Sequence, residues 1–337
     1  MKRSSTSLGL VIAVIAAATF GMSGAFVKPL LVAGWSPAAA VTARALIGGF
    51  VLVPIALVSL RGKRSALWRA RWRIVAMGLI GVAGTQLVYF AALQRIPVNT
   101  AILIEYMAPL LLVGFVWATS RRMPSAVVLI GSVVAVAGLV LVVSPGGGGR
   151  FDLLGLGFAA LATVGCAIYY VVAARPSDGL PPVALAACGL LLGGLVLGIA
   201  GAVGLVPFTA TFGAVRLLGT TVSWWVPLLV VGVFATAVAY ATSITATEML
   251  GSRLASFAGL LEVIAAALYA WILLGEDLTV PQLLGGVLIL TGIAFVRAEK
   301  RGAATMLEAG AIPETTPTAT SLPADPALRA PVELPGG

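Results

Sequence analysis

The stretch LASFAGLLEVIAAALYAWILLGEDLTVPQLLGGVLILTGIAFV, residues 254–296, decides the fold because the chain contains a second copy of its pattern. The copy is TAILIEYMAPLLLVGFVWATSRRMPSAVVLIGSVVAVAGLVLV, residues 100–142, at a constant shift of 154 residues. The shift keeps one tryptophan and two glycines in register, namely Trp117 with Trp271, Gly131 with Gly285 and Gly138 with Gly292. This register indicates a duplicated unit rather than an array of unrelated segments.

Composition identifies an integral membrane protein. Hydrophobic residues make up 60% of the 337 residues and charged residues only 10%, whereas soluble domains have about 25% charged residues. The net charge is +9, but most Lys and Arg residues lie in short connectors between apolar runs, which is typical of a membrane surface. We therefore expect membrane lipids, and no nucleic acid, as partners.

The available residue types argue against several kinds of chemistry. Histidine is absent, which removes the commonest metal ligand and the commonest general base. Cys166 and Cys188 lie in apolar runs, where a cysteine is typically a small packing residue. The sequence has no Gly-x-x-x-x-Gly-Lys loop for binding nucleotide phosphates. We expect no metal, no cofactor and no enzymatic activity.

Ten apolar runs are each long enough to cross a hydrocarbon core of about 30 Å. They lack strand-like alternation, and lipid admits only helices and closed barrels, so the sequence predicts helices. The predicted spans are residues 8–27, 38–60, 74–93, 99–118, 125–144, 153–173, 183–206, 225–247, 254–274 and 281–297.

Each copy has five spans, an odd number, so the second copy must enter the membrane from the opposite side. With the N-terminus inside, fifteen Lys and Arg residues lie at cytoplasmic ends and four at outer ends, which places both termini in the cytoplasm. The connector at residues 120–122 is basic and its counterpart at residues 275–277 is acidic, as inversion requires. The expected fold is an all-α, multi-pass protein of the cell membrane, with ten transmembrane helices in two inverted five-helix repeats.

The expected domain organisation follows from these spans. It comprises a cytoplasmic N-terminus at 1–7, a first repeat at 8–144, a linker at 145–152, a second repeat at 153–297 and a tail at 298–337. The tail is polar and rich in Pro and Thr, so it cannot bury enough apolar surface to fold alone. We expect a disordered cytoplasmic tail.

Inverted repeats predict a binding site near the membrane midplane, where polar side chains face a cavity or one another. Glu262 lies about 12 Å from one end of its span, at 1.5 Å per residue. The small residues Ala255, Gly259 and Ala266 share its helix face, and Gly259 is a candidate for close approach of another helix or a substrate. Glu262 is a candidate proton carrier or ligand of a substrate amine; the alternative is a protonated packing group.

A second acidic candidate, Glu105, lies in span four. Arg44 lies at a similar depth in span two, so either the two residues pair or Glu105 contacts the substrate. Pro109 removes a backbone hydrogen bond and predicts a kink in span four. We expect structural or gating roles for Arg44 and Pro109.

Matching polar residues on spans three and eight complete the set. Thr85 and Tyr89 correspond to Thr236 and Tyr240 at a shift of 151 residues, and each pair has the i, i+4 spacing of one helix face. The other polar candidates inside the spans are Gln86, Tyr169 and Ser23. We expect these side chains, with the two acids, to bind substrate or protons.

The run Phe20-Gly21-Met22-Ser23-Gly24-Ala25-Phe26-Val27-Lys28 resembles the first-helix signature of EamA-type transporters in the drug/metabolite transporter superfamily. Arg44 matches the arginine of their second helix. Gly275-Glu276 followed by Gly285 and Gly292 is similar to the end of their second repeat. The resemblance covers residues 8–297 and implies two inverted five-helix repeats. It also implies export of small metabolites such as amino acids, nucleosides or sugars, commonly driven by protons, and it marks Lys28 as a structural or gating residue.

The sequence therefore predicts a secondary active transporter. We expect an exporter that moves a small polar metabolite, such as an amino acid, across the inner membrane by alternating access with proton coupling. The alternative is a facilitative carrier or a channel-like pore without proton coupling. The expected partners are a small-molecule substrate and membrane lipids.

Overall fold

The computed structural model describes residues 2–63, 65–120, 123, 125–143, 152–173 and 179–309. Its helices are described without side chains at residues 2–7, 109, 112, 113, 116, 119, 120, 142, 143, 169–171, 173, 244, 245, 247–260 and 296–309. Contacts divide the chain into two units, Met1–Glu299 and Lys300–Gly337. The functional residues discussed below all belong to the first unit.

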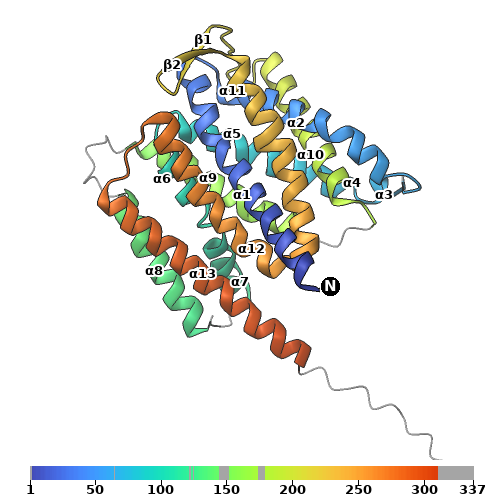
Figure 1. The fold of residues 1–337 in the computed structure, drawn as a ribbon, viewed down its shortest axis with the longest axis vertical. Coiled ribbons are helices and arrows are strands. Elements are labelled where there is room, and N and C mark those ends of the chain that lie inside the picture. The colour runs from blue at the N-terminus through green and yellow to red at the C-terminus, as the bar shows by residue number, and fades with distance from the viewer. Residues whose placement is uncertain are drawn as a thin grey trace, which may run out of the picture. The chain divides into compact units, whose positions relative to one another are not determined.

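The first repeat contains the elements α1 to α8 (Figure 1). They are α1 (Lys2–Val32), α2 (Pro37–Ser59), α3 (Ser65–Arg69), α4 (Arg71–Ala76), the π-helix η1 (Met77–Gly84), α5 (Thr85–Leu93), α6 (Val98–Glu105), α7 (Ala108–Ser120) and α8 (Ala126–Val143). The second repeat contains α9 (Leu153–Ala173), α10 (Pro182–Ala202), β1 (Ala214–Leu217), β2 (Thr220–Ser223), α11 (Trp225–Leu229), the π-helix η2 (Val230–Val238), α12 (Ala239–Leu274) and α13 (Val280–Ala309).

Among the described residues, five helical segments are long and apolar enough to cross a membrane. They are Leu8–Val32, Pro37–Ser59, Arg71–Leu93, Pro182–Ala202 and Trp225–Ser243. Four shorter apolar helices coincide with further predicted spans, namely Ala126–Leu141, Leu153–Ile168, Leu261–Leu274 and Val280–Phe295. The remaining predicted span, at 99–118, corresponds to α6 and α7 together.

That fourth span is interrupted at the position where its proline predicts a kink. α6 ends at Glu105 and α7 begins at Ala108. Pro109 has no N–H group to donate to the carbonyl of Glu105 four residues earlier, so regular helical bonding cannot continue across this point. The Pro109 side chain itself lies outside the described part. The interruption leaves Glu105 as the last residue of α6.

π-helical segments occur at corresponding places in the two repeats. η1 ends just before Thr85, and η2 contains the matching residue Thr236. The Thr85 hydroxyl donates to the Ile80 carbonyl at 2.7 Å, and the Thr236 hydroxyl donates to the Val231 carbonyl at 2.9 Å, both five residues back along the chain. π-helical turns are rare and frequently lie at functional sites. Their presence at both positions therefore supports Thr85 and Thr236 as candidate functional residues.

α12 is helical over 36 residues but reverses its direction. Tyr240 packs edge-on against Phe20, with ring centroids 5.2 Å apart. A Cβ atom at Gly21, the next residue of α1, would lie 2.8 Å from that of Ala265. On a straight helix Tyr240 and Ala265 would be about 37 Å apart, so the chain turns back between them (Figure 1). The residues between the predicted spans at 225–247 and 254–274 belong to α12, so the reversal takes place within helical backbone.

Glycine contacts show how the last helices of the two repeats are related. A Cβ atom at Gly138 of α8 would lie 2.5 Å from the carbonyl oxygen of Gly285 in α13, and one at Gly292 of α13 would overlap the carbonyl oxygen of Gly131 in α8. The 154-residue shift converts one contact into the other. Gly131 contacts Gly292 while Gly138 contacts Gly285, so the two helices run antiparallel. A pseudo-two-fold axis perpendicular to the helices therefore relates them. Such an axis inverts one repeat relative to the other.

The second helices of the repeats obey the same symmetry. A Cβ atom at Gly49 of α2 would lie 2.8 Å from the Leu191 side chain of α10, and one at Gly194 of α10 would lie 3.1 Å from the Leu46 side chain of α2. A shift of 145 residues converts one contact into the other. The small residues let these helix backbones approach closely, which is typical of packing within membranes.

Two groups of helices surround α2 and α10. We name α1, α11, η2 and α12 bundle A, because α1 packs along the other three. We name α9, η1, α5, α6 and α7 bundle B, because α9 packs against the other four. The pseudo-two-fold axis relates the two bundles, since α9 is the first helix of the second repeat as α1 is of the first.

A β-hairpin in the connector after α10 was not predicted. Its strands β1 and β2 are antiparallel and pair Ala214 with Ser223 and Leu217 with Thr220. The residues before it are tied to the corner between α1 and α2, where the Trp35 indole donates to the Thr211 carbonyl at 2.7 Å. Strands of four residues are too short to give a clear alternation of apolar and polar positions.

The ends of the expected domains differ from the helix ends. α13 continues to Ala309, into the expected tail at 298–337, in keeping with the helix-favouring residues Ala, Glu, Lys and Arg at 297–309. Disorder of the tail stays a prediction. α1 begins at Lys2, within the expected N-terminal segment. Residues 310–337 of the tail lie outside the described residues, as does the linker apart from Asp152.

The α8–α13 crossing predicts a strong effect of one methyl group. Gly292→Ala should lower the free energy of unfolding by about 1–3 kcal/mol because the added Cβ meets backbone atoms of α8. Gly286→Ala is the control on the same helix, since its Cβ would lie 3.8 Å from the nearest side-chain atom, on Leu103. Thermal unfolding of the detergent-solubilised variants measures both. Equal midpoints would contradict the crossing.

Candidate functional site

Arg44 is the centre of the polar residues inside the helices. It lies on α2 and is only 5% exposed. Its Nε donates to the Thr236 hydroxyl at 3.1 Å, and its Nη1 donates to the Ser23 hydroxyl at 2.7 Å and to the Gln86 side-chain oxygen at 2.9 Å. Its Nη2 lies 3.4 Å from the Ala235 carbonyl oxygen. One guanidinium therefore joins α2 to α1, α5 and η2.

These contacts link the two bundles. Ser23 and Thr236 belong to bundle A, whereas Gln86 belongs to bundle B. The Arg44 guanidinium also lies over the Phe90 ring of bundle B, 5.4 Å from its centroid, a distance at which the cation is attracted to the ring face. Thr236 can serve Arg44 because its hydroxyl already donates to the Val231 carbonyl and so presents its lone pairs to the guanidinium.

The expected ion pair between Arg44 and Glu105 is not formed. In the described part of the chain the ion pairs are Lys28 with Glu276 and Arg95 with Asp152. Neutral oxygen atoms accept the Arg44 hydrogen bonds instead. Hydroxyl and amide oxygens from three helical elements lie within hydrogen-bonding distance of the planar guanidinium group.

The two acids lie near this centre on opposite bundles. Glu105 ends α6 of bundle B, and Glu262 lies in α12 of bundle A. The two carboxyl groups are close enough to influence each other and Arg44 electrostatically. Tyr106, which follows Glu105 directly, forms a side-chain hydrogen bond with Glu262. The interruption before Pro109 thus places an acid and a phenol of bundle B beside an acid of bundle A.

The tyrosines of the predicted polar faces also meet α1. A Cβ atom at Gly24 would lie 3.3 Å from the Tyr89 hydroxyl, and Tyr89 is buried. Tyr240 packs against Phe20. Because Gly21 meets α12 and Gly24 meets Tyr89 and Val98, the glycines of the first-helix signature let α12 on one hand, and α5 and α6 of bundle B on the other, approach α1 closely.

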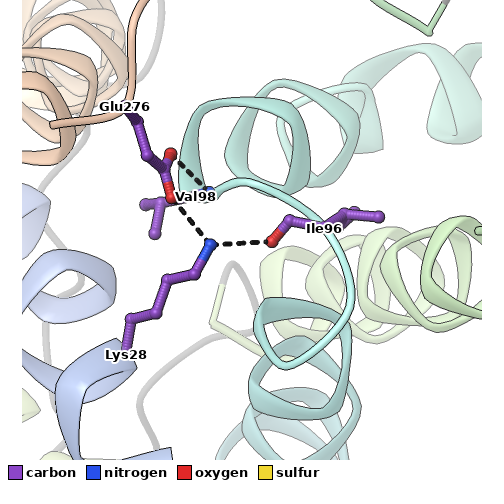
Figure 2. A network of polar contacts seen from close by, with 4 residues as sticks. All are labelled: Lys28, Ile96, Val98 and Glu276. Carbon is purple, nitrogen blue, oxygen red and sulfur yellow. Dashed lines mark hydrogen bonds and ion pairs between the residues drawn. The ribbon is translucent and has the colours of Figure 1, made fainter. Parts of the chain in front are cut away.

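Thr85 has a different role from its counterpart. It is buried, and a Cβ atom at Gly165 of α9 would overlap its hydroxyl, so Thr85 faces α9 rather than Arg44. The side chain of Tyr169 and the surroundings of Gly259, two further candidates, lie outside the described part of the structure. Lys28 lies apart from Arg44 and pairs with Glu276 (Figure 2).

Sequence reasoning missed three residues of these polar contacts. Phe90 is apolar and gives no polar signal, although it lies beside Tyr89. Tyr106 directly follows a candidate acid in a predicted span, which is a signal that could have found it. Glu276 was assigned to a connector, and nothing in the sequence alone indicates that its carboxylate returns to Lys28.

The sequence matches a known family over most of its length. The model of the EamA-like transporter family matches residues 7–144 and 153–298, one match for each repeat. The chain belongs to the EamA-like transporter family. The expected family is thereby confirmed, and so is an all-α membrane protein built from two repeats.

Individual relatives agree with this family. The uncharacterized inner membrane transporter YicL of Salmonella typhimurium is 23% identical over 308 residues, covering 88% of this chain and 97% of YicL. The uncharacterized transporter YvbV of Bacillus subtilis is 26% identical over 279 residues, covering 82% of this chain and 85% of YvbV. A solved crystal structure of a protein with 21% sequence identity has the same fold, with a TM-score of 0.57 over 89% of this chain and 99% of that one. This EamA-like protein is a multi-pass transporter of the cytoplasmic membrane.

The matched threonines predict unequal effects of the same substitution. Thr236→Val removes an acceptor from the buried Arg44 guanidinium and should lower the free energy of unfolding by about 1–3 kcal/mol. Thr85→Val removes only the hydroxyl bond to a carbonyl of its own helix and should have a smaller effect. Thermal unfolding in detergent compares the two variants. A larger loss for Thr85→Val would contradict the central role of Arg44.

Proposed function

We propose that this EamA-like transporter is a proton-coupled secondary exporter of a small polar metabolite, such as an amino acid. One observation carries the proposal: Glu262 of bundle A and Glu105 of bundle B lie within electrostatic range of each other and of Arg44. The two bundles are symmetry mates, so rocking one against the other would change the surroundings of both acids at once. This is the requirement for alternating access.

The proposed proton carrier is Glu262. A carboxyl group out of contact with water favours its neutral form unless a partner stabilises the charge. The partner here is the Tyr106 side chain of the other bundle. Separating the bundles would remove that hydrogen bond and admit water, so the affinity of Glu262 for a proton would differ between the two arrangements. Such a difference is what couples a proton to a conformational cycle.

Arg44 supports the site rather than gripping the substrate in this proposal. Its hydrogen bonds to Thr236, Ser23 and Gln86 occupy most of its donors. A substrate with an amino group would instead find two carboxyl groups, and its remaining polar atoms would meet the Tyr89 and Gln86 side chains. A small zwitterion such as an amino acid fits this mixture of charge. Export is the direction that family resemblance favours, with both termini in the cytoplasm.

Uptake into proteoliposomes tests this function. The wild-type protein, offered a mixed pool of labelled amino acids, nucleosides and sugars, should accumulate one class only under a pH gradient. One coupled proton can support about tenfold accumulation per pH unit. Glu262→Gln should lose gradient-driven accumulation while it keeps its thermal stability and membrane insertion. Asp277→Asn, which changes an exposed carboxylate next to Glu276, is the control and should behave as wild type.

The other outcomes separate the alternatives. Full gradient-driven accumulation by Glu262→Gln would refute its role as proton carrier. Equilibration of one class without any dependence on the gradient would favour a facilitative carrier or a pore.

A further inference from the structure

A second polar cluster surrounds Lys28, which lies near the C-terminal end of α1 (Figure 2). The Lys28 ammonium lies 2.7 Å from the Glu276 carboxylate, with side-chain exposures of 22% and 14%. Glu276 Oε2 accepts a hydrogen bond from the Val98 backbone N–H at 2.9 Å. Lys28 Nζ donates to the Ile96 carbonyl at 3.2 Å. Two charged side chains thus hold the backbone on either side of Pro97.

The position of Glu276 is fixed by the end of α12. Gly275 has a φ of +65°, a conformation that glycine adopts without strain. Its N–H donates to the Trp271 carbonyl at 3.1 Å, and the N–H of Glu276 donates to the Ala270 carbonyl at 3.2 Å. The first of these bonds is that of the αL motif at a helix C-terminus, and the bond from Glu276 adds to it. The turn sets the carboxylate rigidly beside α1.

The two charges belong to one bundle, and their backbone partners belong to the other. Lys28 lies on α1 and Glu276 follows α12, both in bundle A. Val98 is the first residue of α6 in bundle B, so its N–H has no acceptor within its own helix, and a carboxylate is favoured at that helix end. Within this cluster, only the bonds to Ile96 and Val98 have to break when the bundles separate. The ion pair itself can stay intact.

We propose that Lys28 and Glu276 form a latch that closes this end of the transporter by gripping the Ile96–Val98 turn. The proposal rests on the alternating access proposed above. Since the charges remain paired when the grip is released, opening does not leave an unpaired charge beside the membrane, and the latch can open in each cycle. Positive-inside orientation places this end on the outer face of the membrane.

The duplicated sequence does not repeat the latch at the opposite end. The 154-residue shift takes Glu276 to Arg122. An arginine side chain has no acceptor for a backbone N–H. The latch is therefore a feature of one end, and it gives the two openings different stabilities.

A neighbouring ion pair supplies the matched control. Arg95 follows α5 and Asp152 precedes α9, so both belong to bundle B, and their charges lie 3.1 Å apart. The Gly155 backbone N–H, and then Arg95, hold the pKa of Asp152 below its usual value, so Asp152 is charged at neutral pH. This pair ties together elements of one bundle only. Breaking it should not open the transporter.

The test measures access to a reporter cysteine in the full chain, in membrane vesicles. The parent carries Cys166→Ala, Cys188→Ala and Met22→Cys, and the reporter is partly buried in the core about 9 Å from Lys28 along α1, beyond the latch. A membrane-impermeant maleimide is added at each face in turn. Glu276→Ala and Lys28→Ala should raise the rate of modification from one face about tenfold, the population shift expected when a charge-assisted hydrogen bond is lost. Asp152→Asn should leave the rate at the parent value.

The charge-swapped variant Lys28→Glu/Glu276→Lys separates a latch from an ordinary ion pair. It can restore the pair, but a lysine at 276 cannot accept from the Val98 N–H, and a glutamate at 28 cannot donate to the Ile96 carbonyl. The latch predicts recovery of thermal stability while the reporter stays accessible. Recovery of both stability and protection, or parent rates in the alanine variants, would overturn it. The readout needs no substrate, so it stays separate from the proteoliposome result that tests the proposed function.

Discussion

The Arg44 guanidinium imposes the strongest constraint on this structure, because its N–H groups lie where they depend on the protein for acceptors. Those acceptors come from α1, α5 and η2, so the requirement of one side chain fixes the spacing of four helical elements. Glycine makes the approach feasible: a Cβ atom at Gly48 would overlap the Thr236 side chain. Close helix packing and satisfaction of the buried charge are therefore parts of one solution.

That solution places asymmetric chemistry on a symmetric scaffold. The 145-residue shift that relates α2 to α10 takes Arg44 to Gly189, whose Cβ would lie 2.8 Å from the Met77 side chain. The second repeat thus has an apolar contact, between Gly189 and Met77, at the position where the first repeat has the cation Arg44. The same division appears at the matched threonines, since Thr236 accepts from Arg44 and Thr85 packs on α9. The two repeats share the same helix arrangement, and the polar centre depends on the few residues, such as Arg44, that differ between them.

The sequence predicts the frame well because its signals are periodic and local. Apolar runs give the spans, the 154-residue register gives the duplication, and Pro109 marks the interruption after Glu105. Contacts between distant segments carry no such signal. An arginine and a glutamate at equal depth suggested a pair, but Ser23, Gln86 and Thr236 satisfy Arg44 because of how four helices are rotated against one another. The return of Glu276 to Lys28 and the four-residue strands depend likewise on tertiary placement.

The two π-helical segments also constrain how this chain can tolerate change in length. A π-helical turn holds one residue more than an α-helical turn. Deleting one residue within Met77–Gly84 would let that stretch become an ordinary α-helical turn, which covers the same full rotation with one residue fewer. Gln86 would then keep its direction toward Arg44. In a regular α-helical stretch each residue accounts for about 100° of rotation, so a deletion there would turn every later side chain by that amount. The surplus residue in each repeat therefore marks a position where the helix can lose a residue and still present the following side chains to the same neighbours.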